Sequence, residues 1–213
     1  MKITKYLFLG LITLLMSLAL AVSSLAAGPT EQIKAKADLV MKTLNDPALQ
    51  NREEKRRELV MDIVEGMIDW QEVSKRALAL HGKKRTPQEK EEFINLFCDL
   101  LKRTYSEKLD IYSGEQFVYE NETIDGNRAV VKTKVINKKK GTEATVDYRM
   151  LKKGEQWLAY DMVIEGISAV NNYRVQFSEI IASSSYDALV KKMKKKEFER
   201  KGGAKAVSEA TGK

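Results

Sequence analysis

The stretch QFVYENETIDGNRAVVKTKVINKKKGTEATVDYRMLKKGEQWLAYDMVI, residues 116–164, decides the fold. Apolar and polar residues alternate along it with a period of two, which is typical of strands with one apolar and one polar face. Short glycine-containing turn sequences interrupt the alternation at Asp125-Gly126, Lys139-Lys140-Gly141 and Lys153-Gly154. We therefore predict an antiparallel meander of four strands, over 116–122, 129–135, 143–150 and 157–164.

The apolar face of such a sheet has to be covered, and helical signals fill the chain before it. Four residues have the type and spacing of helix N-caps: Thr30, Asn51, Asp69 and Thr86. The last is the strongest, because Pro87 follows at the first helical position and Glu89 completes a capping box. We expect the helix after Thr86 to reach about Tyr112, since large apolar residues recur along it at every fourth position.

Helical signals return after the strands. Ser168 precedes an apolar stripe, Ser183-Ser184-Ser185 interrupts it, and a last, basic helix is expected from Tyr186 to about Arg200. The predicted architecture is α+β, with a helical layer packed on a curved antiparallel sheet of four strands or slightly more. We expect a single domain over 27–201, followed by a flexible tail over 202–213.

The N-terminus has the layout of a secretory signal peptide over 1–26. Lys2 and Lys5 precede an apolar run from Tyr6 to about Val22, and small residues follow up to Ala26. The alternative is a membrane anchor, but the run is short for a span of about 20 apolar residues. We therefore expect cleavage near Ala26 and, in a Gram-negative cell, a periplasmic mature chain of 187 residues.

Composition excludes several classes of function. One cysteine, Cys98, rules out an intramolecular disulfide, and with one histidine, His81, a transition-metal site has little support. Cys98 lies among large apolar residues, so a buried, inert thiol is expected. The chain carries a formal charge of +7, concentrated near the lysines of 191–196. This patch suits anionic lipid or an acidic partner as well as a solvated helix face, and export argues against nucleic acid.

Catalytic motifs are missing from the sequence. It contains no glycine-rich phosphate loop, no nucleophile elbow and no HExxH. A carboxylate in a predicted strand, Asp161, leaves a cavity enzyme that moves a proton on an apolar substrate as one alternative. The other reading of Asp161 is a hydrogen-bonded structural carboxylate.

The run Glu165-Gly166-Ile167-Ser168-Ala169-Val170-Asn171-Asn172-Tyr173-Arg174 resembles the signature of the MlaC family, also called toluene-tolerance auxiliary proteins. Two further segments are similar to the family: Trp70–Leu78, and Thr86-Pro87-Gln88 with the aromatic stripe after it. The resemblance covers nearly the whole mature chain. His81–Lys84 and the lysine-rich C-terminus depart from the family pattern.

The resemblance implies a carrier and not an enzyme. Family members hold phospholipid tails in an apolar cavity between sheet and helices, so phospholipid is expected as cargo and no cofactor is expected. The implied partners are an inner-membrane MCE-domain protein of an ABC transporter and an outer-membrane lipoprotein–porin complex, between which lipid is shuttled to maintain outer-membrane asymmetry. We expect a monomer. An exported adaptor that binds protein through its apolar face is the remaining alternative.

Strand alternation and helix stripes select the residues expected to line the tail pocket. From the strands these are Val131, Val135, Val146, Tyr148, Met150, Tyr160, Met162 and Ile164. From the helices they are Phe97, Leu101, Tyr105, Val170, Tyr173 and Phe177. Arg174 is expected to meet a head-group phosphate, with a structural ion pair as its alternative. A register error of one residue would exchange the two faces of a strand.

Overall fold

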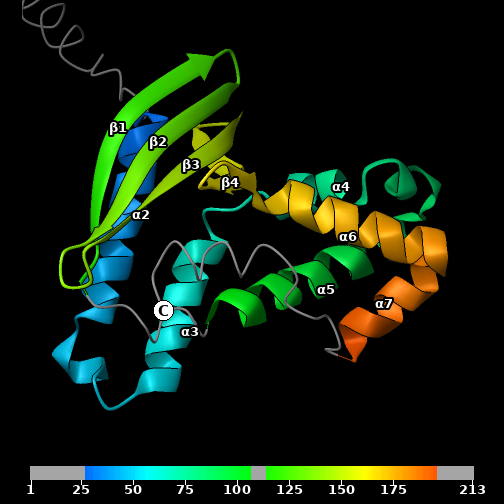
Figure 1. Ribbon diagram of the computed structural model, residues 1–213, viewed down its shortest axis with the longest axis horizontal. Helices are drawn as coiled ribbons and strands as arrows, with labels where there is room; N and C mark the ends of the chain where they lie inside the picture. Colours follow the sequence, from blue (N-terminus) through cyan, green and yellow to red (C-terminus); the bar gives the residue numbers. More distant parts are fainter. Residues whose placement is uncertain (1–26, 107–113, 196–213) are drawn as a thin grey trace, which may run out of the picture.

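A computed structural model describes residues 27–106 and 114–195 (Figure 1). The helices before the sheet are α2 (Pro29–Leu44), η1 (Pro47–Leu49), α3 (Glu53–Glu65), α4 (Trp70–Leu78), η2 (Ala79–Lys84) and α5 (Pro87–Ser106). The sheet contains β1 (Gln116–Asp125), β2 (Arg128–Asn137), β3 (Thr142–Lys153), β4 (Gln156–Ile164) and β5 (Ile167–Ser168). Helices α6 (Ala169–Ser183) and α7 (Tyr186–Lys194) follow it. The fold is therefore α+β, as predicted.

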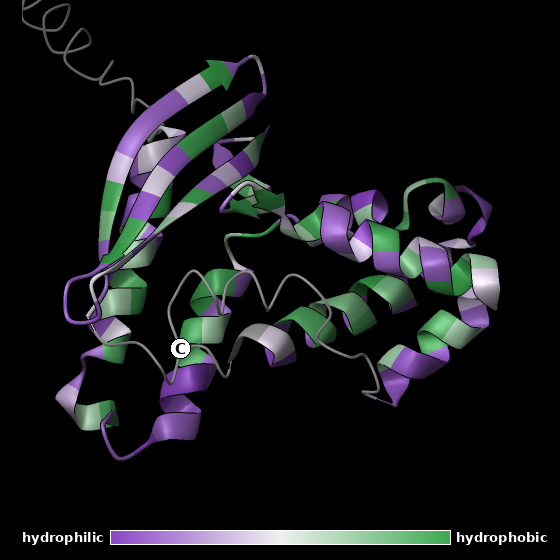
Figure 2. Ribbon diagram, in the orientation of Figure 1, coloured by the Kyte–Doolittle hydropathy of each residue, from purple (hydrophilic) through white to green (hydrophobic). Residues whose placement is uncertain are grey.

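The five strands form one antiparallel sheet in the order β1-β2-β3-β4-β5. The three predicted turns are confirmed, since Gly126, Gly141 and Gly154 have φ values of 58°, 65° and 61°, where a side chain would be strained. The short strand β5 adds one element to the four expected. Polar and apolar residues alternate along β1, β2 and β3, as the sequence indicated (Figure 2).

A β-bulge in β4 corrects one part of the predicted register. Arg149 pairs with Asp161 and Met150 pairs with Ala159, so Tyr160 is an extra residue in β4. The prediction placed Tyr160 on the same face as Met162. The bulge instead directs Tyr160 toward α4, where it packs against the helical core. Strict alternation across the bulge was therefore wrong.

Three of the predicted N-caps are confirmed. Asp69 accepts a hydrogen bond from the Glu72 amide at 3.1 Å, and Ser168 accepts one from the Asn171 amide at 3.0 Å. Thr86 and Glu89 form the reciprocal capping box, with amide-to-side-chain distances of 2.7 and 3.2 Å. These local signals worked because each side chain satisfies amide groups that have no partner inside its own helix.

The other two N-cap predictions are wrong. Helix α2 begins at Pro29, with Gly28 as its N-cap, because proline suits the first helical position. Helix α3 begins after Arg52, one residue past the expected Asn51 cap. The signal peptide at 1–26, the predicted continuation of α5 to Tyr112, the extension of the last helix to Arg200 and the tail at 202–213 lie outside the described residues.

Two apolar clusters form the core. The smaller lies between α2 and the sheet and contains Ile33, Ala129, Val131, Met150 and Trp157. The larger joins α4, α5, α6 and α7 and is centred on Phe93, Phe97, Tyr173 and Phe177. Figure 1 shows α2 along one face of the sheet, while α4–α7 extend away from β4. Strand β4 is therefore the junction between the sheet and the helical layer.

In the described part of the chain, no helix has the length and apolar character needed to cross a membrane.

Candidate functional site

Two hollows lie on either side of the junction between β4 and α6. The larger, which we call the arginine cleft, has a volume of about 960 Å³ and is lined by polar and apolar groups in similar measure. The smaller, which we call the apolar pocket, has a volume of about 180 Å³ and an almost wholly apolar lining. Asp161 and Val170 line both hollows, so these two residues form the wall between them.

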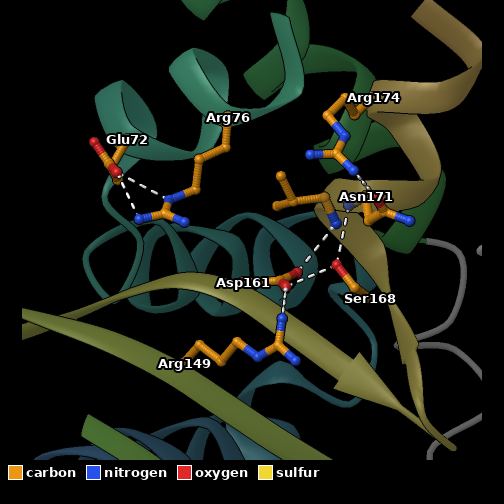
Figure 3. A network of polar contacts seen from close by, with 8 residues as sticks. Glu72, Arg76, Arg149, Asp161, Ser168, Asn171 and Arg174 are labelled. Carbon is orange, nitrogen blue, oxygen red and sulfur yellow. Dashed lines mark hydrogen bonds and ion pairs between the residues drawn. The ribbon is translucent and has the colours of Figure 1, made fainter. Parts of the chain in front are cut away.

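The wall is held by the carboxylate of Asp161, whose side chain is only 5% exposed. Its oxygens accept hydrogen bonds from Arg149 Nη1 at 3.1 Å, from Ser168 Oγ at 2.7 Å and from the Val170 amide at 3.1 Å (Figure 3). A buried carboxylate needs such partners, and the last two lie at the N-terminus of α6, which favours negative charge. Asp161 therefore fastens β4 to the start of α6.

The turn before β5 explains the beginning of the signature run. Glu165 and Gly166 have φ values of 48° and 78°, a left-handed pair that turns the chain from β4 into β5. The Glu165 carboxylate accepts hydrogen bonds from the amide and the hydroxyl of Thr145, and these bonds lower the pKa of Glu165. These contacts hold the β4–β5 turn against β3 and so position the N-terminus of α6.

Three arginines reach the arginine cleft from three different elements. Arg149 comes from β3 and is paired with Asp161. Arg76 comes from α4; its Nη2 lies 2.8 Å from Glu72 Oε1, and its guanidinium lies 4.0 Å from the centroid of the Tyr160 ring. The ion pair and the stacking on Tyr160 together restrict the conformations of the Arg76 side chain.

The third arginine, Arg174, comes from α6. Its Nη2 donates a hydrogen bond to Asn171 Oδ1 one turn earlier (Figure 3). Among the residues that the structure describes, no carboxylate lies within ion-pair distance of Arg174. The structural ion pair considered for Arg174 is thus not formed within this part of the chain, and Arg174 lines the arginine cleft.

The apolar pocket lies between β4 and helices α3, α4, α5 and α6. Its apolar lining is Met61, Val64, Ile68, Trp70, Val73, Leu101, Ala159, Met162, Ala169 and Val170. At its rim Glu65 of α3 and Lys102 of α5 form an ion pair of 2.6 Å. The hydrogen bond to Glu65 raises the pKa of Lys102. Both side chains are about one third exposed, so the pair bridges the two helices where the pocket meets solvent.

The structure brings together only some of the residues expected to line the tail pocket. Leu101, Met162 and Val170 line the apolar pocket. Tyr160 and Arg174 lie in the arginine cleft instead, and Met150 lines a third hollow of about 160 Å³ beside α2.

The other predicted residues lie elsewhere. Phe97 packs edge to face against Tyr173 and Phe177 in the helical core, with ring centroids 5.1 Å apart. The rings of Tyr173 and Phe177 are tilted against each other at 5.6 Å. Val131, Val146 and Ile164 are buried, and Val135 and Tyr148 are half-buried on the same sheet face. Burial raises the pKa of Tyr148 to about 12. The side chain of Tyr105 lies outside the described part of the chain.

Sequence analysis missed the α3 side of the apolar pocket. Met61 and Val64 lie three residues apart on α3, which places them on one helical face, and Ile68 follows in the segment after the helix, bridged to Ala159 of β4. That spacing is a usable signal, but the neighbouring Val60 and Ile63 supply a competing stripe. Val60 is the one fully buried residue of α3, whereas Met61 and Val64 line the pocket, so the two stripes of α3 face different parts of the structure.

Cys98 is buried, as expected, and we predict that it reacts slowly. Burial raises the pKa of its thiol to about 11, from an ordinary value of 9.0. Since the thiolate is the nucleophile, two pKa units correspond to roughly hundredfold less thiolate at pH 8. Ellman's reagent at pH 8 should therefore modify the folded chain about a hundredfold more slowly than the chain in guanidinium chloride. Equal rates would contradict the buried placement.

Three comparisons with known proteins agree with one another. A family model described as MlaC protein matches residues 34–195. The intermembrane phospholipid transport system binding protein MlaC of Haemophilus influenzae is 25% identical over 122 residues, which cover 55% of this chain. The match spans 57% of that relative, which is little more than half of its length.

A solved structure from Ralstonia solanacearum, described as a phospholipid-binding protein in complex with a phospholipid, has a similar fold. Its TM-score is 0.71 and its sequence identity is 22%, over 85% of this chain and 100% of that chain. At this level of identity the similarity establishes the shared fold.

Proposed function

The chain belongs to the MlaC family, and on that premise we propose that it is a phospholipid carrier whose acyl tails occupy the apolar pocket. The observation that carries this proposal is the pocket itself, an apolar hollow between β4 and helices α3 and α5, with Glu65 and Lys102 at its rim and the paired carboxylate of Asp161 in its wall. The phospholipid named for the Ralstonia structure and the transport system named for the Haemophilus relative support the same class of ligand.

The energetics of lipid transfer explain why a carrier needs such a pocket. Each methylene kept from water contributes about 0.8 kcal/mol, so two acyl chains with about 30 methylenes involve roughly 24 kcal/mol as an upper bound. A lipid that leaves a membrane unaccompanied would lose most of this stabilisation. A pocket lined by apolar side chains keeps the acyl chains from water and so preserves this stabilisation while the lipid crosses the aqueous space.

The apolar pocket has to enlarge before it can hold a phospholipid. A cavity of about 150 Å³ accommodates a benzene-sized molecule, and drug-sized ligands occupy about 300–1,000 Å³. The observed volume of about 180 Å³ is therefore smaller than two acyl tails require. We propose that α3 and α5 separate at the Glu65–Lys102 pair, since an ion pair about one third exposed resists opening only weakly. Met61 and Met162 suit a wall that changes shape, because their side chains are flexible.

The proposed carrier works between two membranes. We propose that it is exported through the signal at 1–26, and that it exchanges lipid with an outer-membrane lipoprotein–porin complex and with an inner-membrane MCE-domain protein of an ABC transporter. The family membership supports this route, as does the name of the Haemophilus relative, a binding protein of an intermembrane phospholipid transport system.

The environment of Asp161 argues against the alternative of a cavity enzyme. A general base needs a lone pair that faces its substrate, but the Asp161 carboxylate already accepts three hydrogen bonds from its own chain. Its role in the described structure is to join β4 to α6.

Native mass spectrometry of the chain purified from a bacterial periplasm tests the carrier proposal. We expect a mass increment of one two-tailed phospholipid, which organic extraction then identifies. A lipid-free mass, with no uptake from labelled liposomes, would contradict the proposal and favour a protein-binding adaptor.

Filling the apolar pocket should abolish lipid loading. We predict that Leu101→Trp lowers bound phospholipid to less than one fifth of the wild-type amount, because the larger ring occupies the space of the tails. Leu39→Trp, at a position 44% exposed on α2, is the matched control and should load normally. Total phosphorus per mole of purified protein gives the measurement. Full loading of a folded Leu101→Trp variant would show that the tails bind elsewhere.

A further inference from the structure

The arginine cleft is the larger of the two hollows at the junction, yet tail binding does not account for it. Its floor is the wall formed by Asp161 and Val170, which a hydrogen bond of 3.1 Å between the Asp161 carboxylate and the Val170 amide holds closed. A ligand in the cleft therefore lies on the other side of this wall from the apolar pocket. The rim of that pocket is formed by Glu65 and Lys102, which do not line the cleft.

The charge in the cleft is positive. Arg76, Arg149 and Arg174 line it, and among the residues that the structure describes Asp161 is the only acidic one in its lining. Because Asp161 is buried and already paired, it presents little negative charge to a ligand. Arg76 and Arg174 are held in place by Glu72 and Asn171, so their guanidinium groups lose little entropy when they bind an anion.

The arrangement also shows which groups a ligand would use. The N-terminus of α6 is already occupied, since the Val170 amide donates to Asp161 and the Asn171 amide donates to Ser168. An anion in the cleft would therefore bind to guanidinium groups, which match the oxygen geometry of phosphate. Ile167 and Val175, both 47% exposed, add apolar surface to the lining. Such a lining suits an amphiphile, whose phosphate would bind to the arginines while its apolar part contacts the aliphatic side chains.

We propose that the arginine cleft is a second ligand site, separate from the apolar pocket, which binds a phosphate group through Arg76 and Arg174. This chemistry is shared by a phospholipid head group at a membrane surface and by free phosphate. The aliphatic lining favours the head group, and that choice of source rests on the proposed carrier function. The site changes the role expected of Arg174, which meets a phosphate in this cleft and not at the rim of the tail pocket.

Two binding measurements on the purified chain test the site. The first is sedimentation with vesicles of phosphatidylcholine alone or with added phosphatidylglycerol. The second is calorimetric titration with inorganic phosphate against chloride at constant ionic strength. Arg174→Gln is the test variant. Arg128→Gln is the matched control, because Arg128 is an exposed arginine beside the β1–β2 turn and its loss changes the net charge equally.

We expect Arg174→Gln to weaken binding to the phosphatidylglycerol vesicles about fivefold, the contribution of one basic side chain near an anionic surface. Arg128→Gln should have less than half this effect. If only inorganic phosphate binding depends on Arg174, the site stands and its ligand is free phosphate. If both variants behave alike with both probes, the proposal is overturned.

The lipid content of the same preparations separates this proposal from the carrier function. Arg174→Gln protein that still carries a phospholipid but binds vesicles poorly supports two separate sites. If the purified chain carries no lipid but binds phosphate through Arg174, the phosphate site in the cleft is supported and the carrier function is contradicted. Loss of carried lipid in Arg174→Gln, with no change in vesicle or phosphate binding, would show that Arg174 serves the tail pocket and would overturn the second site.

Discussion

Replacing Asp161 with alanine is expected to lower the free energy of unfolding by about 3 kcal/mol, because hydrogen bonds to a charged group contribute about 1.5–3 kcal/mol each. The variant leaves the Val170 amide and the Ser168 hydroxyl without their acceptor at the start of α6. The Arg149 ion pair adds little, since the Arg149 side chain is 45% exposed. Urea unfolding followed by far-ultraviolet circular dichroism measures the change.

Asp147→Ala is the matched control for this substitution. Asp147 is a half-buried aspartate on β3 opposite Val163, and its side chain makes no hydrogen bond or ion pair within residues 27–106 and 114–195. Its replacement should change stability by less than about 1 kcal/mol. Equal effects of the two substitutions would contradict the fastening role of Asp161. A third variant, Asp161→Asn, keeps an acceptor and should fall between the two.

Replacing Phe177 with alanine is expected to cost about 4 kcal/mol, within the range for a buried phenylalanine. The Phe177 ring is fully buried and lies 5.1 to 5.6 Å from the rings of Phe93, Phe97 and Tyr173, so its removal leaves a cavity between α5 and α6. Val175→Ala, two residues away at a position 47% exposed, should cost less than about 1 kcal/mol. The measurement is urea unfolding of lipid-free protein.

This prediction also decides between two roles for the aromatic stripe. If Phe177 belongs to a closed core, its loss destabilises the lipid-free protein. If Phe177 lines the tail pocket, as the stripe on its own predicted, Phe177→Ala should leave lipid-free stability nearly unchanged and reduce the bound phospholipid. The second result would contradict the packing described above.

Local signals in the sequence were sufficient for the element order. The capping box at Thr86 and Glu89 formed as predicted, because both partners lie within one turn of helix. The glycine turns at 126, 141 and 154 formed because their left-handed backbone depends on a single residue. The same reasoning failed at Thr30 and Asn51, because the N-caps are Gly28, two positions before Thr30, and Arg52, one position after Asn51.

The assignment of residues to the pocket was less predictable. Leu101, Met162 and Val170 line the apolar pocket, while Phe97 and Phe177, which share the same apolar character and helical spacing, are closed in the core. Periodicity indicates which face of a helix is buried, but the wall of a pocket and the wall of a core require the same side chains. The bulge that turns Tyr160 toward Arg76 likewise leaves no mark in the alternation of β4.

The sequence alone determined the α+β class, the meander, the signature run and the family, because each depends on residues that are close together in the chain. Only the tertiary structure decided that Asp161 joins β4 to α6, and that Arg76, Arg149 and Arg174 meet in one cleft. Those arginines lie on a helix, a strand and a second helix, up to 98 positions apart. Their convergence depends on how the helices dock on the sheet, and docking is decided by the sum of many contacts between distant residues.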